Sequence, residues 1–447
     1  MSAINRIWTK RRTGGIHPSR NNGNAGAVAA SGVRSALGEG RAQLSQPLIV
    51  IGQPGDKRTE GIQSALAKLA LPPAVVVSYA DVLQGEGALT RAAQALESPP
   101  LLRLESPGGS FQTEKALIAL GAPDAAGEGD DTLHPLPDHP GSCPLSASSA
   151  LRLPELPGVL HHPGQWFRGY CRLLAKLRRE AETALPGATW LNDPKEIALM
   201  TDKRRTQEAL TLAGVAVPRI IGGAAAPPTD YETLREAMAA EGIYRVFVKL
   251  ASGSAASGVI AYQVNPVTGA EIAMTTIGVE RYVTRPPVYY NSGKLKRYTE
   301  SGEIAAIVNW LYKHGAHAEQ WIAKRRAGGL ASDIRQLVAG GKAGHAVVRA
   351  SKTPVTNLHL RSQRMDADEA GLSTEVQEQV QRIALQTSAV FPYSFSMGID
   401  VLVSEGAQRC YVTDVNPFGD LLYGVRHEGL TPYEWEMALL FGRSGGA

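Results

Sequence analysis

The chain has 447 residues, a length that corresponds to several packed units at roughly 100 to 200 residues per domain. Hydrophobic residues make up 43% and charged residues 20%, a globular composition that excludes a fibrous or wholly disordered chain. No stretch approaches the ~18 consecutive uncharged apolar residues of a membrane span, so we expect no membrane partner. Cys143, Cys171 and Cys410 are widely spaced and odd in number, which argues against a disulfide framework and favours a cytoplasmic protein.

The formal net charge of +4 is concentrated at the N-terminus. Residues 1–45 hold seven basic side chains and one acidic side chain, whereas the rest of the chain holds 39 basic and 41 acidic ones. The globular part is therefore not basic, and we expect no nucleic-acid partner. The leader is rich in Gly, Asn, Ser and Ala, so we predict that residues 1–45 are disordered, with a transit peptide as the alternative.

Alternating strand and helix patterns predict a first domain of α/β type over residues 46–125. Short β-branched runs at 47–52 and 74–78 flank a helical pattern at 59–70, and the segment Leu-Leu-Arg-Leu-Glu-Ser-Pro-Gly-Gly at 101–109 precedes a helix at 112–120. This order is typical of an open α/β unit. Residues 126–163 are rich in Pro, Gly, Asp and Ser and are expected to form a linker.

The remaining chain, residues 164–440, is expected to form a second region built mainly from short strands. Helices are predicted at 165–184 and 193–212. Strands at 245–250 and 259–264 belong to a first subdomain over about 190–265. Strands at 305–311, 319–323, 334–339 and 346–350, followed by an antiparallel hairpin at 397–403 and 409–416, belong to a second subdomain over about 300–435.

A small-residue loop between two of these strands is a candidate phosphate-binding flap. It runs from Ser252 to Gly258, and its backbone N–H groups and Ser hydroxyls suit an oxyanion. It opens onto a strand, unlike the common nucleotide-binding motifs, which open onto a helix. A flexible surface hairpin is the alternative. Lys249 interrupts the apolar run before the loop and needs a partner, which is either an anionic ligand or a structural carboxylate.

The C-terminal hairpin is a candidate metal site. Period-2 alternation puts Asp414 and Asn416 on one face of their strand, and Asp400 is the single acid of the opposing strand. Two carboxylates and an amide oxygen suit magnesium, which often uses one or two carboxylates and completes its shell with phosphates. The alternative is turn and capping chemistry before Pro417.

Two arginines on predicted neighbouring strands complete the set of candidate residues. Arg335 and Arg349 carry planar guanidinium groups that bind phosphoryl oxygens. Together with Lys203 and Lys249 they outnumber the two carboxylates of the hairpin, which suits a polyphosphate. Solvated rim residues are the alternative for strand arginines.

The order of these segments over about residues 190–435 resembles the ATP-grasp superfamily, and within it the carboxylate-amine ligases similar to the ribosomal-protein glutamate ligase. The resemblance rests on Asp202-Lys203, Phe247-Val248-Lys249 with its loop, Glu319-Gln320-Trp321-Ile322, Asp333-Ile334-Arg335, Arg349, Asn357-Leu358-His359, Gly398-Ile399-Asp400 and Asp414-Val415-Asn416. It implies an α/β (α+β) chain with an ATP-grasp fold that follows a small α/β domain.

The resemblance also implies cofactors and residue roles. The cofactors would be ATP and Mg²⁺, with Mn²⁺ as an alternative. The implied nucleotide-binding residues are Lys203, Lys249, Ser252, Gly253, Ser254, Gly258, Glu319, Gln320, Trp321, Ile322 and Lys324, with the backbone of 319–322 reading adenine. Catalytic roles fall to Arg335, Arg349 and Asn357, and metal ligation falls to Asp400, Asp414 and Asn416.

The implied activity is formation of an amide bond between a carboxylate and an amine, such as a peptide or amino acid, through an acyl phosphate. Two departures from the family pattern keep alternatives open. Asp414 stands where the family has Glu, which leaves a regulatory ATP-binding module as an alternative. Arg361 and Arg364 follow Asn357 where the ligase has a glycine pair, so the two arginines are candidates for binding an acidic substrate. A kinase-like phosphotransferase is the third hypothesis.

Overall fold

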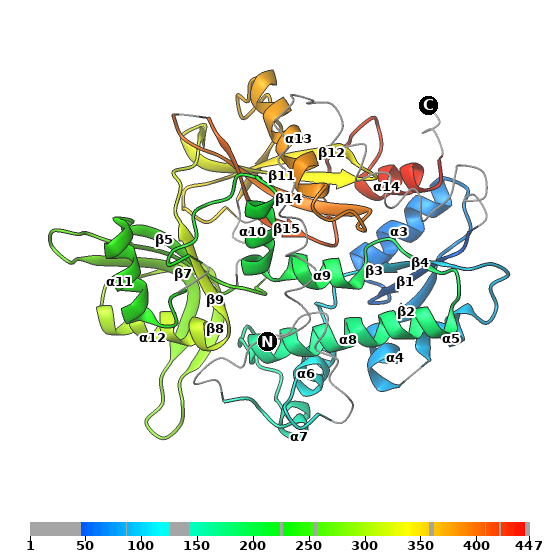
Figure 1. Ribbon diagram of the computed structural model, residues 1–447, viewed down its shortest axis with the longest axis horizontal. Coiled ribbons are helices and arrows are strands. Elements are labelled where there is room, and N and C mark those ends of the chain that lie inside the picture. The colour runs from blue at the N-terminus through cyan, green and yellow to red at the C-terminus, as the bar shows by residue number, and fades with distance from the viewer. Residues whose placement is uncertain are drawn as a thin grey trace, which may run out of the picture.

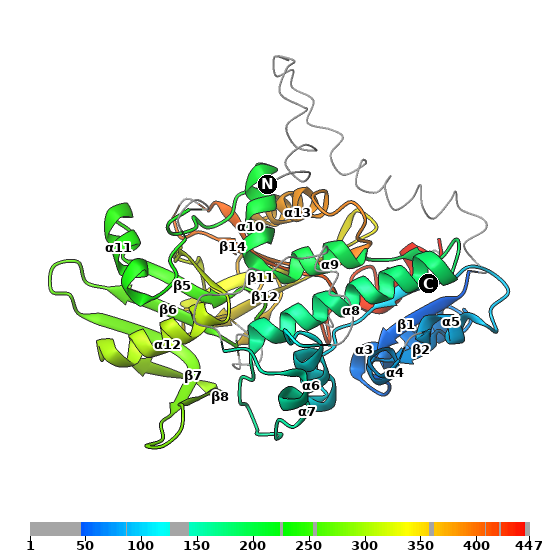
Figure 2. The ribbon, with the colours of Figure 1, turned by 60° about the horizontal axis from the view of Figure 1, so that its bottom comes forward.

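The fold is a mixed α/β arrangement of three β-sheets, which confirms the predicted class. In the computed structural model the sheet of β11–β15 lies between the other two (Figures 1 and 2). The structure describes residues 46–85, 87–125, 143–223, 227–253, 257–356, 362–406, 408–419 and 422–442. The predicted leader at 1–45 lies outside the described residues. None of the described helices has the length and apolar character that a bilayer crossing requires.

The first sheet is parallel, with strand order β2-β1-β3-β4. Its strands are β1 (Leu48–Gly52), β2 (Val75–Ser78), β3 (Leu101–Leu104) and β4 (Thr189–Trp190). The connecting helices are α3 (Lys57–Lys68), α4 (Tyr79–Gln84), α5 (Ala88–Ala93), α6 (Phe111–Leu120), α7 (Ala147–Leu151) and α8 (Pro163–Ala184). Each residue of β1 is buried, as expected of a parallel strand covered on both faces.

Alternate residues of β1 enter two different cores. Ile49 and Ile51 pack in a cluster with α4, α5, α6 and α8. Leu48 and Val50 pack in a cluster with α3 and the C-terminal helix α14 (Pro432–Leu440). Because α8, β4 and α14 complete this unit, we propose that the N-terminal domain extends through Trp190 and includes α14. The domain boundaries expected from the sequence, at 125 and 163, did not include these parts.

The second sheet is antiparallel, with order β8-β7-β6-β5-β9. Its strands are β5 (Arg245–Leu250), β6 (Val259–Val264), β7 (Glu271–Glu280), β8 (Val288–Tyr298) and β9 (Ala316–Gln320), and one face packs on α11 (Tyr231–Glu241) and α12 (Ser301–Lys313). The predicted strands at 245–250 and 259–264 match β5 and β6. The predicted strand at 305–311 is wrong, because this segment lies in α12. Its buried positions, Ile304, Ile307, Val308 and Leu311, follow helical spacing.

The third sheet is also antiparallel, with order β13-β12-β11-β14-β15 and β10 paired to β11. Its strands are β10 (Arg326–Ala327), β11 (Leu330–Ala339), β12 (Lys342–Ser351), β13 (Gln363–Met365), β14 (Ser396–Val403) and β15 (Cys410–Asn416). One face packs on α13 (Thr374–Ser388) and on α9 (Pro194–Thr201) and α10 (Lys203–Leu212). The predicted C-terminal hairpin is confirmed as the antiparallel pair β14–β15.

The single helix predicted over 193–212 is two helices that meet at Asp202. This residue ends α9 and also caps α10, where its side chain accepts a hydrogen bond from the Arg204 backbone N–H at 3.0 Å. Its extended backbone conformation breaks the helix, as is usual for an N-cap. The break places Lys203 at the first position of α10, where its side chain leaves the helix end.

Helices α6 and α8 approach each other through a pair of glycines. A Cβ at Gly169 would lie 1.8 Å from the Leu117 carbonyl oxygen, and one at Gly121 would lie 2.0 Å from the Gln165 carbonyl oxygen. Both obstacles are backbone atoms, so neither helix can accommodate a methyl group without moving.

Gly169→Ala is therefore expected to destabilise the fold by about 3 kcal/mol, at the upper end of overpacking costs. The measurement is the thermal unfolding midpoint by circular dichroism. Gly302→Ala in α12 is the matched control, because a Cβ there meets nothing within 4 Å. We expect this control to unfold at or slightly above the wild-type temperature. Equal midpoints for the two variants would contradict the close approach of α6 and α8.

Candidate active site

A pocket lies between the second and third sheets, with an empty volume of about 850 Å³, open solvent included. Twelve of the residues expected from the sequence line it: Lys203, Lys249, Gly253, Glu319, Gln320, Ile322, Lys324, Arg335, Arg349, Asp400, Asp414 and Asn416. These residues come from α10, from both antiparallel sheets and from the segments beside them. The structure therefore brings together residues that are up to 213 positions apart in the sequence.

The wall formed by the second sheet follows from strand register. In β5, Phe247 and Lys249 share one face, and Phe247 lies opposite Glu319 of β9. Both residues of β5 line the pocket, whereas Val246, Val248 and Leu250 point into the core with α11 and α12. Successive side chains of β5 therefore point alternately to the pocket and to the core.

Glu319 is the buried partner of Lys249. The two side chains form an ion pair in which the carboxylate is 2% exposed. Gln207 of α10 donates a hydrogen bond from Nε2 to Glu319 Oε2 at 2.7 Å, and His317 Nε2 lies 3.6 Å from the same oxygen. Burial by itself would raise the pKa of Glu319, but Lys249 and His317 outweigh it and hold that pKa at about 2. Burial lowers the pKa of His317.

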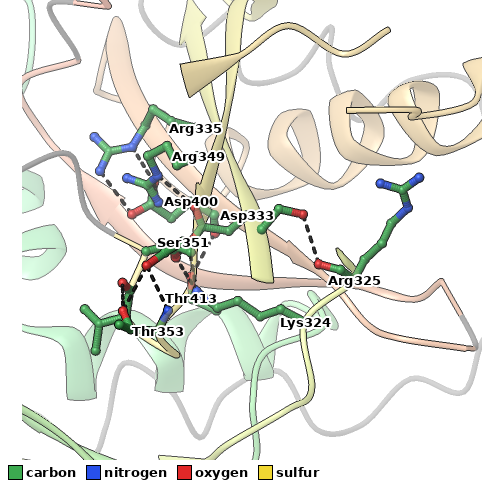
Figure 3. A network of polar contacts seen from close by, with 12 residues as sticks. Lys324, Arg325, Asp333, Arg335, Arg349, Ser351, Thr353, Asp400 and Thr413 are labelled. Atoms are coloured by element: carbon green, nitrogen blue, oxygen red, sulfur yellow. Dashed lines mark hydrogen bonds and ion pairs between the residues drawn. The ribbon is translucent and has the colours of Figure 1, made fainter. Parts of the chain in front are cut away.

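The wall formed by the third sheet is a row of charges across three strands. Arg335 of β11 pairs in register with Asp400 of β14, and Asp400 pairs in register with Asp414 of β15. Arg335 Nη2 donates to Asp400 Oδ2 at 3.0 Å, and its Nε donates to Oδ1. Arg349 Nη2 lies 3.0 Å from Asp400 Oδ1, so two guanidinium groups converge on one carboxylate (Figure 3).

Asp333 completes this charge network from the next pocket-facing position of β11. It lies opposite Arg349 of β12 in register and accepts a hydrogen bond from Arg349 Nε at 2.7 Å. Lys324 Nζ donates to its other oxygen at 2.9 Å (Figure 3). Thr356 donates to the same oxygen. Although burial opposes the shift, the arginines hold the pKa of Asp400 below its usual range, and Arg349 and Lys324 do the same for the pKa of Asp333.

A β-bulge shapes the end of the hairpin. Asp400 pairs with Asp414, but the next residue, Val401, pairs with Val412, so Thr413 is the extra residue on β15. A bulge re-aims side chains and increases the local twist. As a result both Thr413 and Asp414 line the pocket, although strict alternation would place them on opposite faces.

Lys203 connects α10 to the metal-candidate strand. Its backbone N–H donates to the Ala251 carbonyl at 2.9 Å, which ties the start of α10 to the segment before the small-residue loop. Its Nζ lies 2.9 Å from Asp414 Oδ1 and 3.1 Å from Oδ2. This one ammonium therefore contacts both oxygens of the carboxylate.

Several expected site residues lie away from the described pocket lining. Gly258 faces Leu250, where a Cβ would come within 2.3 Å of its Cδ1, and its φ is +70°, so this glycine serves the turn. Trp321 packs against Phe247 at 5.3 Å between ring centroids, with the Arg245 guanidinium 4.3 Å from its ring. Ser252 does not line the pocket. Ser254, Asn357 and Arg361 lie outside the described residues.

The expected backbone hinge at 319–322 is only partly available. The Gln320 N–H donates to the Arg219 carbonyl at 2.8 Å, and the Trp321 N–H donates to the Arg245 carbonyl at 3.0 Å. Glu319 contributes a buried side chain rather than a backbone group. Sequence reasoning did not assign Phe247, Thr356 and Thr413 to the site. Alternation from Lys249 could have identified Phe247, but no sequence signal indicates the bulge that re-aims Thr413.

The pocket holds almost balanced charge. Among the described residues, its lining contains five cationic side chains, from Lys203, Lys249, Lys324, Arg335 and Arg349, and four carboxylates, from Glu319, Asp333, Asp400 and Asp414. The sequence-based count, which set four cations against two carboxylates, missed the contributions of Glu319 and Asp333. The excess of positive charge is therefore smaller than expected, and an incoming polyphosphate has to exchange ion-pair partners with the carboxylates.

The donor set of Asp400, Asp414 and Asn416 fits a magnesium ion. Two carboxylates and one amide oxygen are hard ligands, and Asn416 Nδ2 already donates to the Gly398 carbonyl at 3.2 Å, which leaves the amide oxygen as its ligand atom. No cluster of three or more His, Cys, Asp or Glu side chains suited to a metal occurs in the described parts of the chain.

Comparisons with known proteins identify similar folds at low identity. No family model matches the chain, and no curated protein matches its sequence. A structure of the ATP-grasp ligase PsnB with a precursor variant, Mg and ADP is 14% identical, with a TM-score of 0.47 over 89% of this chain and 99% of that one. The D-alanine–D-alanine ligase from Bacillus anthracis with ATP is 11% identical, with a TM-score of 0.46 over 89% of this chain and 96% of that one.

The N5-carboxyaminoimidazole synthetase from Staphylococcus aureus with ADP is 10% identical, with a TM-score of 0.44 over 90% of this chain and 79% of that one. These scores are all below 0.5. The candidate site is defined by the residues and topology of this chain, in which two antiparallel sheets enclose a charged pocket next to a parallel sheet.

The depressed pKa of Glu319 predicts a specific dependence of stability on pH. A carboxyl with a folded-state pKa of about 2, against an ordinary 4.5, stabilises the fold fully above pH 4.5. That stabilisation is lost as the pH falls from 4.5 toward 2. Glu319→Gln should unfold at a lower temperature than wild type at pH 7, because it leaves Lys249 without its charged partner.

The difference in unfolding midpoint between wild type and Glu319→Gln should stay constant from pH 7 to 5 and shrink between pH 4.5 and 2. Thermal scans across this range measure it. Glu378→Gln, in an exposed ion pair with Arg382, is the control and should match wild type throughout. A Glu319→Gln deficit that persists unchanged at pH 2.5 would refute the ion-pair interpretation.

Proposed function

We propose that the protein is an ATP- and magnesium-dependent carboxylate-amine ligase that acts through an acyl phosphate. One observation carries this proposal above all: Arg335, Arg349 and Lys203 converge on two carboxylates, Asp400 and Asp414, that face each other across one hairpin. In such a site the cations that would bind phosphoryl oxygens directly contact the carboxylate oxygens that would bind a metal. This is the arrangement that phosphoryl transfer requires, since its catalysis is mostly positioning and charge stabilisation.

Each wall of the pocket would have its own part in binding. The base of the nucleotide would lie against the apolar residues Phe247, Val259 and Ile322, and Lys249 and Lys203 would contact the phosphates. Asp400, Asp414 and the amide oxygen of Asn416 would hold magnesium, which neutralises phosphate charge when bound. Arg335 and Arg349 would then release Asp400 and bind the transferred phosphoryl group.

The proposed chemistry has two steps. A substrate carboxylate oxygen bonds to the γ-phosphorus while the bond from that phosphorus to the bridging oxygen of ADP breaks. An amine nitrogen then bonds to the acyl carbon of the acyl phosphate, phosphate leaves with the electron pair of the broken C–O bond, and the nitrogen loses a proton. Arg335 and Arg349 would stabilise the phosphoryl charge in both steps.

Lys249→Ala is expected to weaken ATP binding by roughly 10- to 100-fold, the loss of one charge-assisted contact. Isothermal titration calorimetry measures this affinity, and Lys313→Ala on the exposed end of α12 is the control, with unchanged affinity. Asp414→Asn should retain ATP binding but abolish magnesium-dependent release of ADP in the presence of amino acids and peptides. Full turnover by Asp414→Asn would refute the assigned metal role.

The products of the same assay separate the competing hypotheses. A ligase releases ADP and phosphate together with an amide product, whereas a kinase-like enzyme releases ADP and leaves the phosphoryl group on its product. Nucleotide binding without turnover for any substrate would instead support a regulatory module.

Because cationic side chains already contact Asp400 and Asp414, we predict that metal binding depends on bound nucleotide. All four oxygens of Asp400 and Asp414 already contact a guanidinium or ammonium group. Phosphate oxygens would draw these cations away and free the carboxylates for the metal. We expect Mn²⁺ affinity, measured by electron paramagnetic resonance, to rise at least about tenfold when a non-hydrolysable ATP analogue is present.

Lys203→Met tests the cause of this dependence. It removes the cation from Asp414, so Mn²⁺ alone should bind this variant more tightly than wild type. The exposed variant Arg382→Met serves as the control. Equal Mn²⁺ affinity in wild type with and without the analogue would contradict the exchange of partners.

A further inference from the structure

We propose that the parallel-sheet unit positions the metal-binding end of β15 by holding residues 417–419, with Asn192 and Arg58 as positioning residues. This inference rests on the proposed function, because it assigns these residues an effect on the metal ligand Asn416. The three residues after Asn416 are each held by a different part of the parallel-sheet unit or of the segment that leaves it.

Asn192 holds the first of the three residues. It follows β4 and is 6% exposed. Its Nδ2 donates to the Pro417 carbonyl at 2.7 Å and to the Ser396 carbonyl at 2.7 Å, and its Oδ1 accepts from the Ser396 N–H at 3.2 Å. One buried amide therefore joins the start of β14 to the residue directly after Asn416. Both the nitrogen and the oxygen of its side-chain amide take part in these contacts.

Arg58 holds the second residue, Phe418. Its Nη1 donates to the Phe418 carbonyl at 2.8 Å, and the half-buried Phe418 ring packs against the core of α8 and the parallel sheet. The segment that follows the metal-candidate strand thus inserts an aromatic side chain into a different unit of the protein. Its backbone is fixed at the same point by a charged donor from α3.

Gly419 is held by close packing. Its φ is +59°, and a Cβ there would lie 3.1 Å from Glu436 Oε1 of α14. On the other side, a Cβ at Gly398 of β14 would lie 2.9 Å from the Gly419 carbonyl oxygen and 3.3 Å from Arg335 Nη1. The Gly398 carbonyl also accepts the hydrogen bond from Asn416. Two glycines in contact therefore set the spacing between this segment, the metal-candidate amide and Arg335.

A buried charge network holds the side chains that contact residues 418 and 419. Arg103 of β3 donates to Glu105 Oε1 and to Glu436 Oε2, both at 2.7 Å, and Arg58 Nη1 lies 3.4 Å from Glu105 Oε2. Glu105 and Glu436 are fully buried, and Arg103 is 4% exposed. Two arginines and two glutamates balance in charge, although Glu436 Oε1 accepts no hydrogen bond from the described residues. The network connects β3, α3 and α14 directly beneath residues 418 and 419.

A positioning role follows from this geometry. Asn416 orients its amide through the Gly398 carbonyl, and its main chain continues into three residues that the other unit fixes. A shift of about 1 Å in a reacting group can lower a rate by roughly a hundredfold. Loss of these anchors should therefore impair metal binding while leaving the nucleotide contacts of Lys249 and Phe247, which lie on the second sheet, unchanged.

The test uses two variants of the full chain, Asn192→Ala and Arg58→Met, with Arg382→Met as the exposed control. Two affinities are measured: that of a non-hydrolysable ATP analogue in EDTA, by calorimetry, and that of Mn²⁺ in the presence of saturating analogue, by electron paramagnetic resonance. We expect Mn²⁺ affinity to fall at least about tenfold in both variants, with analogue affinity in EDTA within about twofold of wild type.

Each outcome decides the proposal. Unchanged Mn²⁺ affinity in Arg58→Met, which keeps Glu105 paired with Arg103, would overturn the inference even if Asn192→Ala fails to fold. An equal loss of analogue affinity in EDTA would also overturn it, because that pattern indicates general loosening. Absence of analogue-dependent Mn²⁺ binding in wild type would refute the proposed function itself and remove the basis of the inference.

Discussion

The structure depends on pairing opposite charges in register across neighbouring antiparallel strands. Arg335, Asp400 and Asp414 occupy one row across β11, β14 and β15, and Asp333 and Arg349 occupy another. Charges at this depth are tolerated only when they are paired and hydrogen-bonded. Each charge in these rows therefore needs an oppositely charged partner when the sheet buries it. This requirement places the cations and the carboxylates of the candidate site in contact.

That constraint also explains why the site needs the parallel sheet beside it. The face of β11 that presents Asp333 and Arg335 to the pocket continues into Leu337 and Ala339, which pack in the core shared with α3 and α14. One strand face is thus charged at one end and apolar at the other. The parallel-sheet unit covers the apolar end, and the same unit holds residues 417–419 beside the charged end.

Much of this site could be predicted because it depends on short-range periodicity. Alternation in β15 identified Asp414 and Asn416, and single charges in apolar runs identified Lys249 and Asp400. The failures have physical causes. The segment 305–311 is an apolar run whose length suits a strand or a helix. In the structure it is helical and packs against both α11 and β5. The bulge at Thr413 depends on pairing with β14, which no local pattern contains.

The same limits apply to long-range partners. Glu319 was assigned to a backbone hinge. The sequence left a structural carboxylate open as the partner of Lys249, but it does not show which strand supplies that carboxylate. The membership of α14 in the parallel-sheet core was also hidden, because the sequence does not show which distant residue pairs with its buried Glu436. In the structure, Glu436 pairs with Arg103, 333 positions earlier in the chain.

The bulge at Thr413 bears on the presence of Asp414 where the resembling family has Glu. A shorter carboxylate needs its partners to come closer, and here Asp414 lies directly opposite Asp400 with its two oxygens 2.9 and 3.1 Å from the Lys203 ammonium. Lys203 reaches this point because the chain breaks at Asp202 and α10 starts beside the Ala251 carbonyl. The helix break places Lys203 beside Asp414, and the bulge turns Asp414 into the pocket. The shorter side chain therefore contacts the Lys203 ammonium while it lies opposite Asp400 in register.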